Sequence, residues 1–325
     1  MHFHLRHALH YTYERPVFLE PTTLRLLPRQ DPAQRTLHHD LRVTAAPSGW
    51  SRVLEPDGHE ARVLWFDDLR EALSIEVDIV VRTLRENPFD WIVTHPPARR
   101  LPLAYPPVEA ASLAPSLADG EAGIAAAVRA WALEQAEAVE FSTTDFLMHL
   151  ADTIHHGFHH VGRPDGDPMT AEETLRTRTG ACRDTAMLFV EACRSLGLAA
   201  RFVSGYSMHH PPEVSEHELH AWAEVYVPGG GWRGYDPSLG LAVADGHVAL
   251  AAAPDHRLAA PVSGSYRGTG VGSSMRYTVE VRTAETLEEL TQLERERPLV
   301  LPPPEEWLAG EGTGGSGDQG LQSGH

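Results

Sequence analysis

The sequence predicts an α+β protein, with a β domain first and a mixed domain second. Up to about residue 93, apolar residues alternate with polar ones, which is the pattern of strands with one buried face. Residues 94–120 are rich in proline and interrupt that pattern. Beyond them, apolar residues first recur at helical spacing and then alternate again. We therefore expect two domains in this chain of 325 residues.

The first domain is predicted to be an antiparallel β-sandwich over residues 1–95. In its clearest strand an apolar residue occupies every second position from Leu73 to Val81. Residues 3–13 and 37–43 repeat the pattern, and turn clusters such as "PSG" and "EPDGHE" separate the runs. Short strands joined by such turns are typical of a sandwich.

Two segments are predicted to lack regular structure. Residues 96–120 are expected to be a linker, because proline lacks a backbone N–H and interrupts helices and central strands. Residues 286–325 are rich in proline and then in glycine and serine, and are expected to form a flexible tail.

Residues 121–285 are predicted to begin with helices. Apolar residues at helical spacing mark the first two, and a capping box formed by Thr170 and Glu173 begins a short third one. A longer helix is expected from about Cys182 to Leu196, where Gly197 would end it.

Alternation returns after this helix and predicts an antiparallel sheet. The segments "RFVSGY", "HAWAEVYV" and "GWRGYDP" indicate successive strands, and "PGGG" between the last two is typical of a tight turn. A further strand is expected from Met275 to Arg282. Helices followed by such a sheet make the second domain α+β.

Composition restricts the partners. A formal net charge of −18 argues against nucleic acid and anionic membrane surfaces, since both would repel the protein. The first 13 residues alternate in polarity instead of forming a secretory signal, and no apolar run approaches the roughly 18 residues of a membrane span. With two cysteines and no disulfide framework, the protein is expected to be cytoplasmic.

Cys182 is a candidate nucleophile. It lies at the predicted start of a helix, where unpaired N–H groups and the positive end of the helix dipole favour a thiolate. Cys193 follows eleven residues later, about 16 Å along the helix, too far for a disulfide within it. We interpret Cys193 as a core residue.

His220 and Asp236 are candidate partners for this thiol. A thiolate enzyme needs a base that takes a proton and later returns one, and a carboxylate can orient that base. His220 begins one predicted strand and Asp236 ends the next, so an antiparallel pairing can bring them together. Taken one at a time, these residues also fit purely structural roles, as a buried cysteine, a hydrogen-bonded sheet histidine and a turn aspartate.

Four motifs occur in order: "GACRD", "RFVSGY", "HAWAEVYVPGGGW" and "GYDP". Together they resemble the transglutaminase-like superfamily, in particular its bacterial branch of transglutaminase-like cysteine proteases. Residues 1–95, which include "LRHALHYTYERPVFLEPTTLRLLPR", resemble the β-rich N-terminal domain of that branch. Within residues 145–285 the resemblance is carried by Gly180, Cys182, Arg183, Asp184, Ser204, Gly205, Tyr206, His220, Ala221, Trp222, Glu224, Trp232, Asp236 and Pro237.

The resemblance implies a papain-like core of helices packed on an antiparallel sheet. It assigns Cys182 as nucleophile, His220 as general base and acid, and Asp236 as the orienting carboxylate. The implied activity is thioester chemistry on the amide bonds of a peptide or protein, without a cofactor. Thr185 departs from the family, which often has an aromatic residue there, and the loop "SMHHPPEVSEHELH" is longer than usual. Both departures are expected near the substrate entrance.

Several alternatives stay open at this stage. The acyl-enzyme can be resolved by water, as in a protease or amidase, which is our first choice, or by an amine, as in a transglutaminase. A peptide-binding module without catalysis is a third possibility. Trp222 is expected either to wall the site or to be an ordinary core residue.

A metal site is a weaker hypothesis. Four histidines offer ligand pairs at i, i+4 spacing, but Gly157 interrupts their helix and no glutamate provides a base for hydrolysis. We therefore expect no bound metal. The histidines concerned are His155, His156, His159 and His160.

Overall fold

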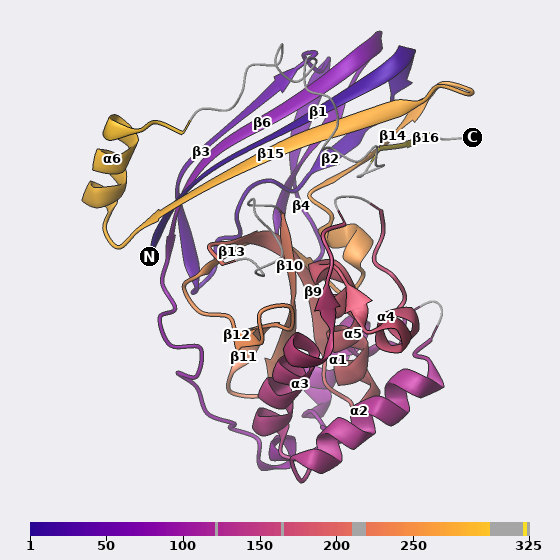
Figure 1. Ribbon diagram of the computed structural model, residues 1–325, viewed down its shortest axis with the longest axis vertical. Coiled ribbons are helices and arrows are strands. Elements are labelled where there is room, and N and C mark those ends of the chain that lie inside the picture. Colours follow the sequence, from indigo (N-terminus) through magenta and orange to yellow (C-terminus); the bar gives the residue numbers. More distant parts are fainter. Residues whose placement is uncertain (121–122, 164–165, 210–218, 300–320, 324–325) are drawn as a thin grey trace.

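The computed structural model describes residues 1–120, 123–163, 166–209, 219–299 and 321–323. A large curled sheet lies above a domain of helices and a smaller sheet (Figure 1). The predicted α+β class is confirmed, with an antiparallel β domain at the N-terminus and helices packed on an antiparallel sheet after it. The segment "SMHHPPEVSEHELH" lies mostly outside the described residues.

The first sheet has nine strands in the part of the chain that the structure describes. They are hydrogen-bonded in the order β3-β6-β1-β14-β2-β5-β4, with β15 also beside β1 and β16 beside β14. The layers expected of a sandwich are thus joined into one continuous sheet. The strands are β1 (His2–Leu19), β2 (Thr22–Leu24), β3 (Gln34–Thr44), β4 (Gly49–Leu54), β5 (Glu60–Trp65), β6 (Leu69–Thr83), β14 (Val262–Arg267), β15 (Ser273–Ala284) and β16 (Leu321–Ser323).

The centre of this sheet follows from the alternation in the sequence. The odd-numbered apolar residues of β6 are buried and face those of β1, in a register that sets Leu5 opposite Ile79. Their hydrophobic cluster also contains Tyr206 and Val248 of the second domain. The first sheet therefore shares its core with the domain below it.

The strand expected from Met275 to Arg282 forms, as part of β15, but not in the expected domain. It pairs antiparallel with β1 over twelve residues, from His2 opposite Ala284 to Tyr13 opposite Ser273. Residues 262–284 therefore complete the first sheet, although they fall inside the range expected for the second domain, residues 121–285. Alternation identifies a strand and its buried face, whereas the choice of partner strand depends on distant parts of the chain.

The expected linker, residues 96–120, contains regular structure. It forms a 3₁₀ turn, η1 (Pro96–Arg99), and the helix α1 (Pro107–Leu117). Pro107 takes the first helical position, where its missing N–H costs no hydrogen bond. Tyr105 fixes the segment to the second domain: its hydroxyl donates to the Tyr226 carbonyl at 2.7 Å and accepts from the Ala199 N–H at 2.9 Å.

The second domain is built on a sheet with strand order β12-β11-β10-β9-β13. The three strands expected from "RFVSGY", "HAWAEVYV" and "GWRGYDP" form as neighbours. The strands are β9 (Ala200–Ser207), β10 (His220–Val227), β11 (Gly231–Asp236), β12 (Leu241–Ala242) and β13 (His247–Ala253); the helices are α2 (Ala126–Ala138), α3 (Thr143–Gly157), α4 (Ala171–Thr177) and α5 (Cys182–Ser195), with a 3₁₀ turn η2 (His256–Ala259) and a small parallel pair, β7 (His159–His160) and β8 (Thr179–Gly180).

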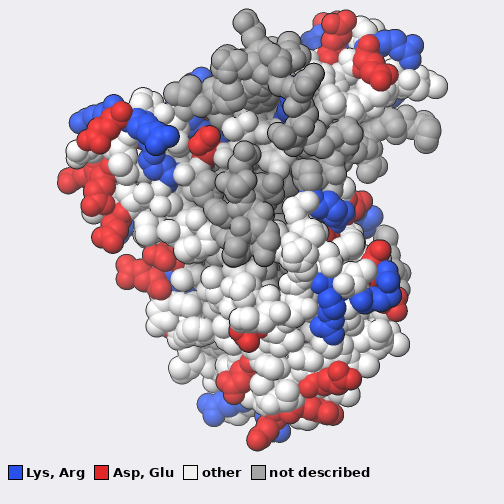
Figure 2. Space-filling model, in the orientation of Figure 1, with Lys and Arg blue, Asp and Glu red and all other residues white. Residues whose placement is uncertain are grey.

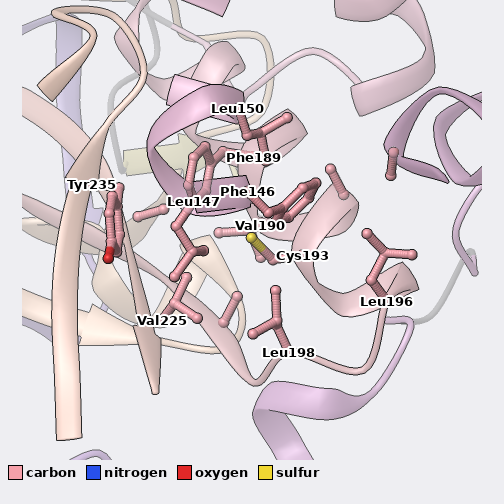
Figure 3. Packing of buried hydrophobic residues seen from close by; sticks show 14 of the residues in the cluster. Phe146, Leu147, Leu150, Phe189, Val190, Cys193, Leu196, Leu198, Val225 and Tyr235 are labelled. Atoms are coloured by element: carbon pink, nitrogen blue, oxygen red, sulfur yellow. The ribbon is translucent and has the colours of Figure 1, made fainter. Parts of the chain in front are cut away.

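The helix α5 is the centre of this domain. It runs from Cys182 as expected, and Gly197 follows its end with a φ of 78°. Figure 3 shows Cys193 on α5 surrounded by apolar side chains from α3, α5 and the sheet. Cys193 is fully buried, as expected of a core residue.

The expected tail, residues 286–325, begins with a helix, α6 (Leu287–Glu296). Thr286 and Glu289 form its capping box, and Glu294 reaches back to His4 of β1 at 2.8 Å. Figure 2 shows the mixed acidic and basic side chains of α6 at one edge of the molecule. Capping and ion pairing thus hold a polar segment that its composition alone would leave unfolded. Residues 300–320 and 324–325 lie outside the described residues.

Among the described helices, none combines the length and apolar character needed to cross a lipid bilayer.

Candidate active site

Cys182 opens α5 and is half-buried. The preceding turn is held by Asp184, which is fully buried and accepts hydrogen bonds from the N–H of Ala181 at 2.7 Å and of Met169 at 2.8 Å. Arg163 donates to the same carboxylate at 2.5 Å. These contacts fix the residue before the thiol, and Asp184 caps the start of α5.

Gly180 has a steric role in this turn. A Cβ atom there would lie 2.8 Å from the Cβ of Asp184, closer than real side chains approach. Its backbone does not need a left-handed conformation, so the glycine serves the close approach of Asp184.

His220 and Asp236 meet as their strands predict. His220 is the first residue of β10, Asp236 is the last of β11, and the two strands form an antiparallel hairpin. The His220 Nε2 atom lies 2.6 Å from Asp236 Oδ2. Cys182 lies beside His220: both residues line one pocket, and the Cys182 side chain helps to raise the pKa of the imidazole. Since Nε2 is engaged by the carboxylate, Nδ1 is the ring nitrogen available to the thiol.

Asp236 is fixed by several hydrogen bonds that its carboxylate accepts. Its Oδ1 accepts from the Ser238 N–H at 3.0 Å, the Ser238 hydroxyl at 2.7 Å and the Leu239 N–H at 3.2 Å. Burial would raise the pKa of this fully buried carboxyl, but His220 and His247 hold the pKa far below its usual range. Asp236 is therefore an anion at neutral pH.

This anion acts on His220. Burial lowers the pKa of an imidazole, but Asp236, followed by Cys182, outweighs burial and raises the His220 pKa well above 6.5. The arrangement thus stabilises a cationic ring beside a sulfur atom, as required of a base that receives a thiol proton.

Comparison with known proteins agrees with this architecture. The sequence model of the Transglutaminase-like superfamily matches residues 129–237. The model of the Bacterial transglutaminase-like N-terminal region matches residues 3–82. Residues 129–237 thus belong to the transglutaminase-like superfamily, and residues 3–82 to the N-terminal region of its bacterial members. The first match contains all three candidate residues and the second covers most of the first sheet.

A solved structure with the same fold comes from Cytophaga hutchinsonii and is described as a "Putative Cysteine Protease". It is 20% identical, has a TM-score of 0.67, and the alignment covers 88% of this chain and 91% of that one. Among sequences, an uncharacterized protein of Mycobacterium tuberculosis is 27% identical over 79% of this chain and 84% of its own length. An uncharacterized protein of Mycobacterium leprae is 32% identical over 30% of this chain, which covers 36% of that protein.

The transglutaminase-like site contains a second histidine that sequence reasoning missed. His247 begins β13, is buried, and places Nε2 3.0 Å from the same Asp236 Oδ2 that binds His220. Since Asp236 is an anion, both ring nitrogens donate to it. Nothing in the local pattern around "DGHVAL" pointed to this role, which arises because β13 pairs with β9, the neighbour of β10.

Trp222 walls the site, one of its two expected roles. Its buried ring stacks on His220, with ring centroids 6.1 Å apart, and meets His247 edge-on at 5.1 Å. The indole thus keeps water from one face of the histidine pair.

Glu224 lies on the same strand as His220 but forms ion pairs with two arginines. It accepts hydrogen bonds from Arg201 at 2.9 Å and from Arg29, which comes from the first domain, at 2.6 Å. Burial would raise its pKa, but the two arginines hold the pKa well below 4.5. Glu224 therefore links the two domains, and Arg29 is a further residue that the sequence did not single out.

The four histidines considered for a metal do not converge. His155 donates from Nδ1 to the Ser238 carbonyl at 2.8 Å, and His156 lies beside Asp152 on the surface. Among the described residues, the side chains whose ligand atoms do converge are His220, Asp236 and His247. Their separations of 2.6 and 3.0 Å are those of hydrogen bonds between imidazole N–H groups and a carboxylate.

Proposed function

We propose that this protein is a thiol-dependent acyl hydrolase that cleaves amide bonds in peptides or proteins. In this proposal Cys182 is the nucleophile, His220 the general base and acid, and Asp236 the orienting carboxylate. The observation that supports it is the pairing of His220 with the buried Asp236 anion at 2.6 Å, on a ring that lines the same pocket as Cys182 at the start of α5.

The reaction has two steps. His220 takes the thiol proton to give a thiolate and an imidazolium, the sulfur of Cys182 then bonds to the substrate carbonyl carbon, and the C–N bond breaks as His220 passes that proton to the departing amine. Water next bonds to the carbon of the thioester, giving one proton to His220, and the C–S bond breaks to restore the thiol. The N–H of Cys182, in the first turn of α5, has no partner within the helix and can stabilise the oxyanion.

The second oxyanion donor is expected from the segment before Cys182. Residues 160–163 border a small pocket that Cys182 also lines. This position agrees with the expectation that the "GFHHVGRPDGDP" segment supplies the donor.

Alkylation tests the nucleophile. With iodoacetamide at neutral pH, followed by peptide mapping, Cys182 should react much faster than Cys193, whose thiol is buried and has a raised pKa. His220→Ala should slow the reaction at Cys182, whereas His156→Ala, at an exposed histidine, should not. Equal rates at the two cysteines, or no effect of His220→Ala, would indicate the alternative of a binding module without catalysis.

A second experiment separates hydrolysis from amine transfer, the alternative activity. The protein is incubated with a glutamine-containing peptide library and a fluorescent primary amine, and the products are read by mass spectrometry. The chain is well suited to this assay, because all 27 of its Lys and Arg residues are arginine, so the added amine competes with no lysine of the enzyme. Cleavage without incorporation of the amine supports our proposal, and incorporation establishes a transglutaminase.

A further inference from the structure

A pocket of about 150 Å³ lies beside the proposed nucleophile and is built by both domains. Cys182 and His220 form part of its wall, and the exposed Asp167 lies at its rim. The rest of the wall is mostly apolar, although Arg183 and His256 also line it. It includes Leu9 and Tyr11 of β1, Phe202 of β9, Ala221 of β10, and Pro261 and Val262 before and in β14.

Ser204, a buried polar residue that also lines the pocket, does not offer a free donor to it. The Ser204 hydroxyl donates to the carbonyl of Ala259 at 2.5 Å, so its hydrogen points into the wall. The ring of Phe202 lies edge-on to that of His256, with centroids 6.2 Å apart. A ligand entering here therefore meets apolar surface, which favours an apolar group over a charged one.

The wall contributed by the first domain is fixed in position. On β1, residues 7, 9 and 11 point to the same side of the strand. The His7 Nδ1 atom is hydrogen-bonded to the Tyr206 hydroxyl at 2.9 Å, and both residues are buried. Burial lowers the pKa of His7 to about 3, so the contact is a neutral one that persists at physiological pH. This contact, next to Leu9, holds the β1 side of the pocket against β9.

The size of the pocket suits one side chain. An engineered protein cavity of similar volume, about 150 Å³, binds benzene. A leucine or phenylalanine side chain is of this scale, whereas glycine or alanine would leave most of the space unfilled.

We propose that this pocket binds an apolar side chain of the acyl donor, next to the carbonyl that Cys182 attacks. The proposal rests on the proposed thiol-dependent function and adds a substrate class: peptides with leucine, phenylalanine or a similar residue on the acyl side of the cleaved bond. The acyl side is assigned because the acyl group stays bonded to Cys182 through both steps, while the amine leaves after the first. Leu9 and Tyr11 then make the first domain part of the specificity site.

The test uses peptidyl acyloxymethyl ketones that differ only in the side chain next to the ketone: glycine, leucine, phenylalanine or aspartate. The rate of modification of Cys182 is measured by mass spectrometry for each. The leucine and phenylalanine probes should react on the order of 10- to 100-fold faster than the glycine probe, and the aspartate probe slowest. Equal rates for all four probes would overturn the proposal.

Two variants test whether the pocket residues determine the preference for the leucine probe over the glycine probe. Ala260→Phe, at a residue that lines the pocket, should reduce the leucine-to-glycine ratio about tenfold by filling it. Ala111→Phe, on the exposed face of α1, is the matched control and should keep the ratio. If Ala260→Phe does not fold, Leu9→Ala should widen the pocket and move the preference from leucine to phenylalanine. A ratio unaffected by either pocket variant contradicts the proposal.

A binding measurement separates this proposal from the proposed function. In Cys182→Ala, which has no nucleophile, chemical shift changes should show N-acetyl-leucinamide binding more tightly than N-acetyl-glycinamide. If the wild type reacts with no probe but this difference is present, the hydrolase proposal fails and the apolar pocket stands. If the two amides bind equally, the pocket proposal fails whatever the reactivity of Cys182.

Discussion

His220 and His247 direct their Nε2 atoms to the same oxygen of Asp236, at 2.6 and 3.0 Å. His220 lines the same pocket as Cys182, so one carboxylate binds both the proposed base and a second, supporting ring. The supporting ring is neutral, because burial lowers the pKa of His247 despite the nearby carboxylate.

The shared oxygen makes His247 a positioning residue. In His247→Leu, Asp236 loses a competing donor and its charge acts more fully on His220, so the pKa of His220 should rise further. The alkaline limb of the rate profile for Cys182-dependent cleavage should then move to higher pH. His247→Asn, which retains an N–H donor, should restore the wild-type profile. If both variants lower the melting temperature and leave the limb in place, His247 has only a structural role.

Asp236→Asn should reduce kcat on the order of 10³- to 10⁴-fold, the size of effect seen when the carboxylate that orients a catalytic histidine is neutralised. The reason is that a neutral amide cannot stabilise the His220 cation formed when the thiol loses its proton. The comparison is Asp152→Asn, at an exposed aspartate of α3, which should retain wild-type kcat. A kcat within tenfold of wild type for Asp236→Asn would remove Asp236 from the mechanism.

The raised pKa of His220 fixes the direction of the pH dependence. Because the ring keeps its proton above its ordinary pKa of 6.5, activity should persist through neutral pH and fall only as the pH rises through the raised value. The stability from this pairing has the same sign: it is complete below pH 6.5 and is lost as the pH rises through the folded-state pKa. Initial rates measured from pH 5 to 10 give the pH at which activity falls. A fall centred near pH 6.5 would contradict the observed pairing with Asp236.

Glu224→Gln should weaken the connection between the domains. Removing one charge from the buried group that joins Arg29, Glu224 and Arg201 leaves Arg201 without its ion-pair partner and Arg29 with only Asp31 at 3.4 Å, at a cost of about 3–5 kcal/mol of unfolding free energy. Urea denaturation at pH 7 measures the loss. Glu60→Gln, which breaks the exposed pair with Arg52, is the control and should leave the midpoint nearly unchanged.

The same substitution has a pH signature. The pKa of Glu224 is held well below its unfolded value of 4.5, so its stabilisation is present above that value and declines as the pH falls toward the folded-state pKa. The advantage of wild type over Glu224→Gln should therefore be full at pH 7 and shrink below pH 4.5. An advantage that is independent of pH would show that the charge of Glu224 is not its source.

Much of the fold could be predicted because the burial of one face of a strand or helix is visible in the pattern of its own residues. Every second residue from Leu73 to Val81 is apolar because one face of β6 is buried, and Thr170 accepts from the Glu173 N–H because α4 needs a cap. The site residues Cys182, His220 and Asp236 could be proposed for the same reason. Each lies at the end of an element whose boundary the sequence marks, and a short hairpin joins the last two.

The remaining features depend on contacts between distant segments. The sequence by itself determined the strand at residues 275–282, but only the tertiary structure decided that it pairs with β1. The helix in the proline-rich segment is held by packing that composition does not show. His247, Arg29 and Leu9 reach the site or its neighbourhood from β13 and from the first domain. Periodicity records which side of an element is buried, whereas the partner that buries it is selected by the free energy of the whole folded chain, to which residues far apart in sequence contribute together.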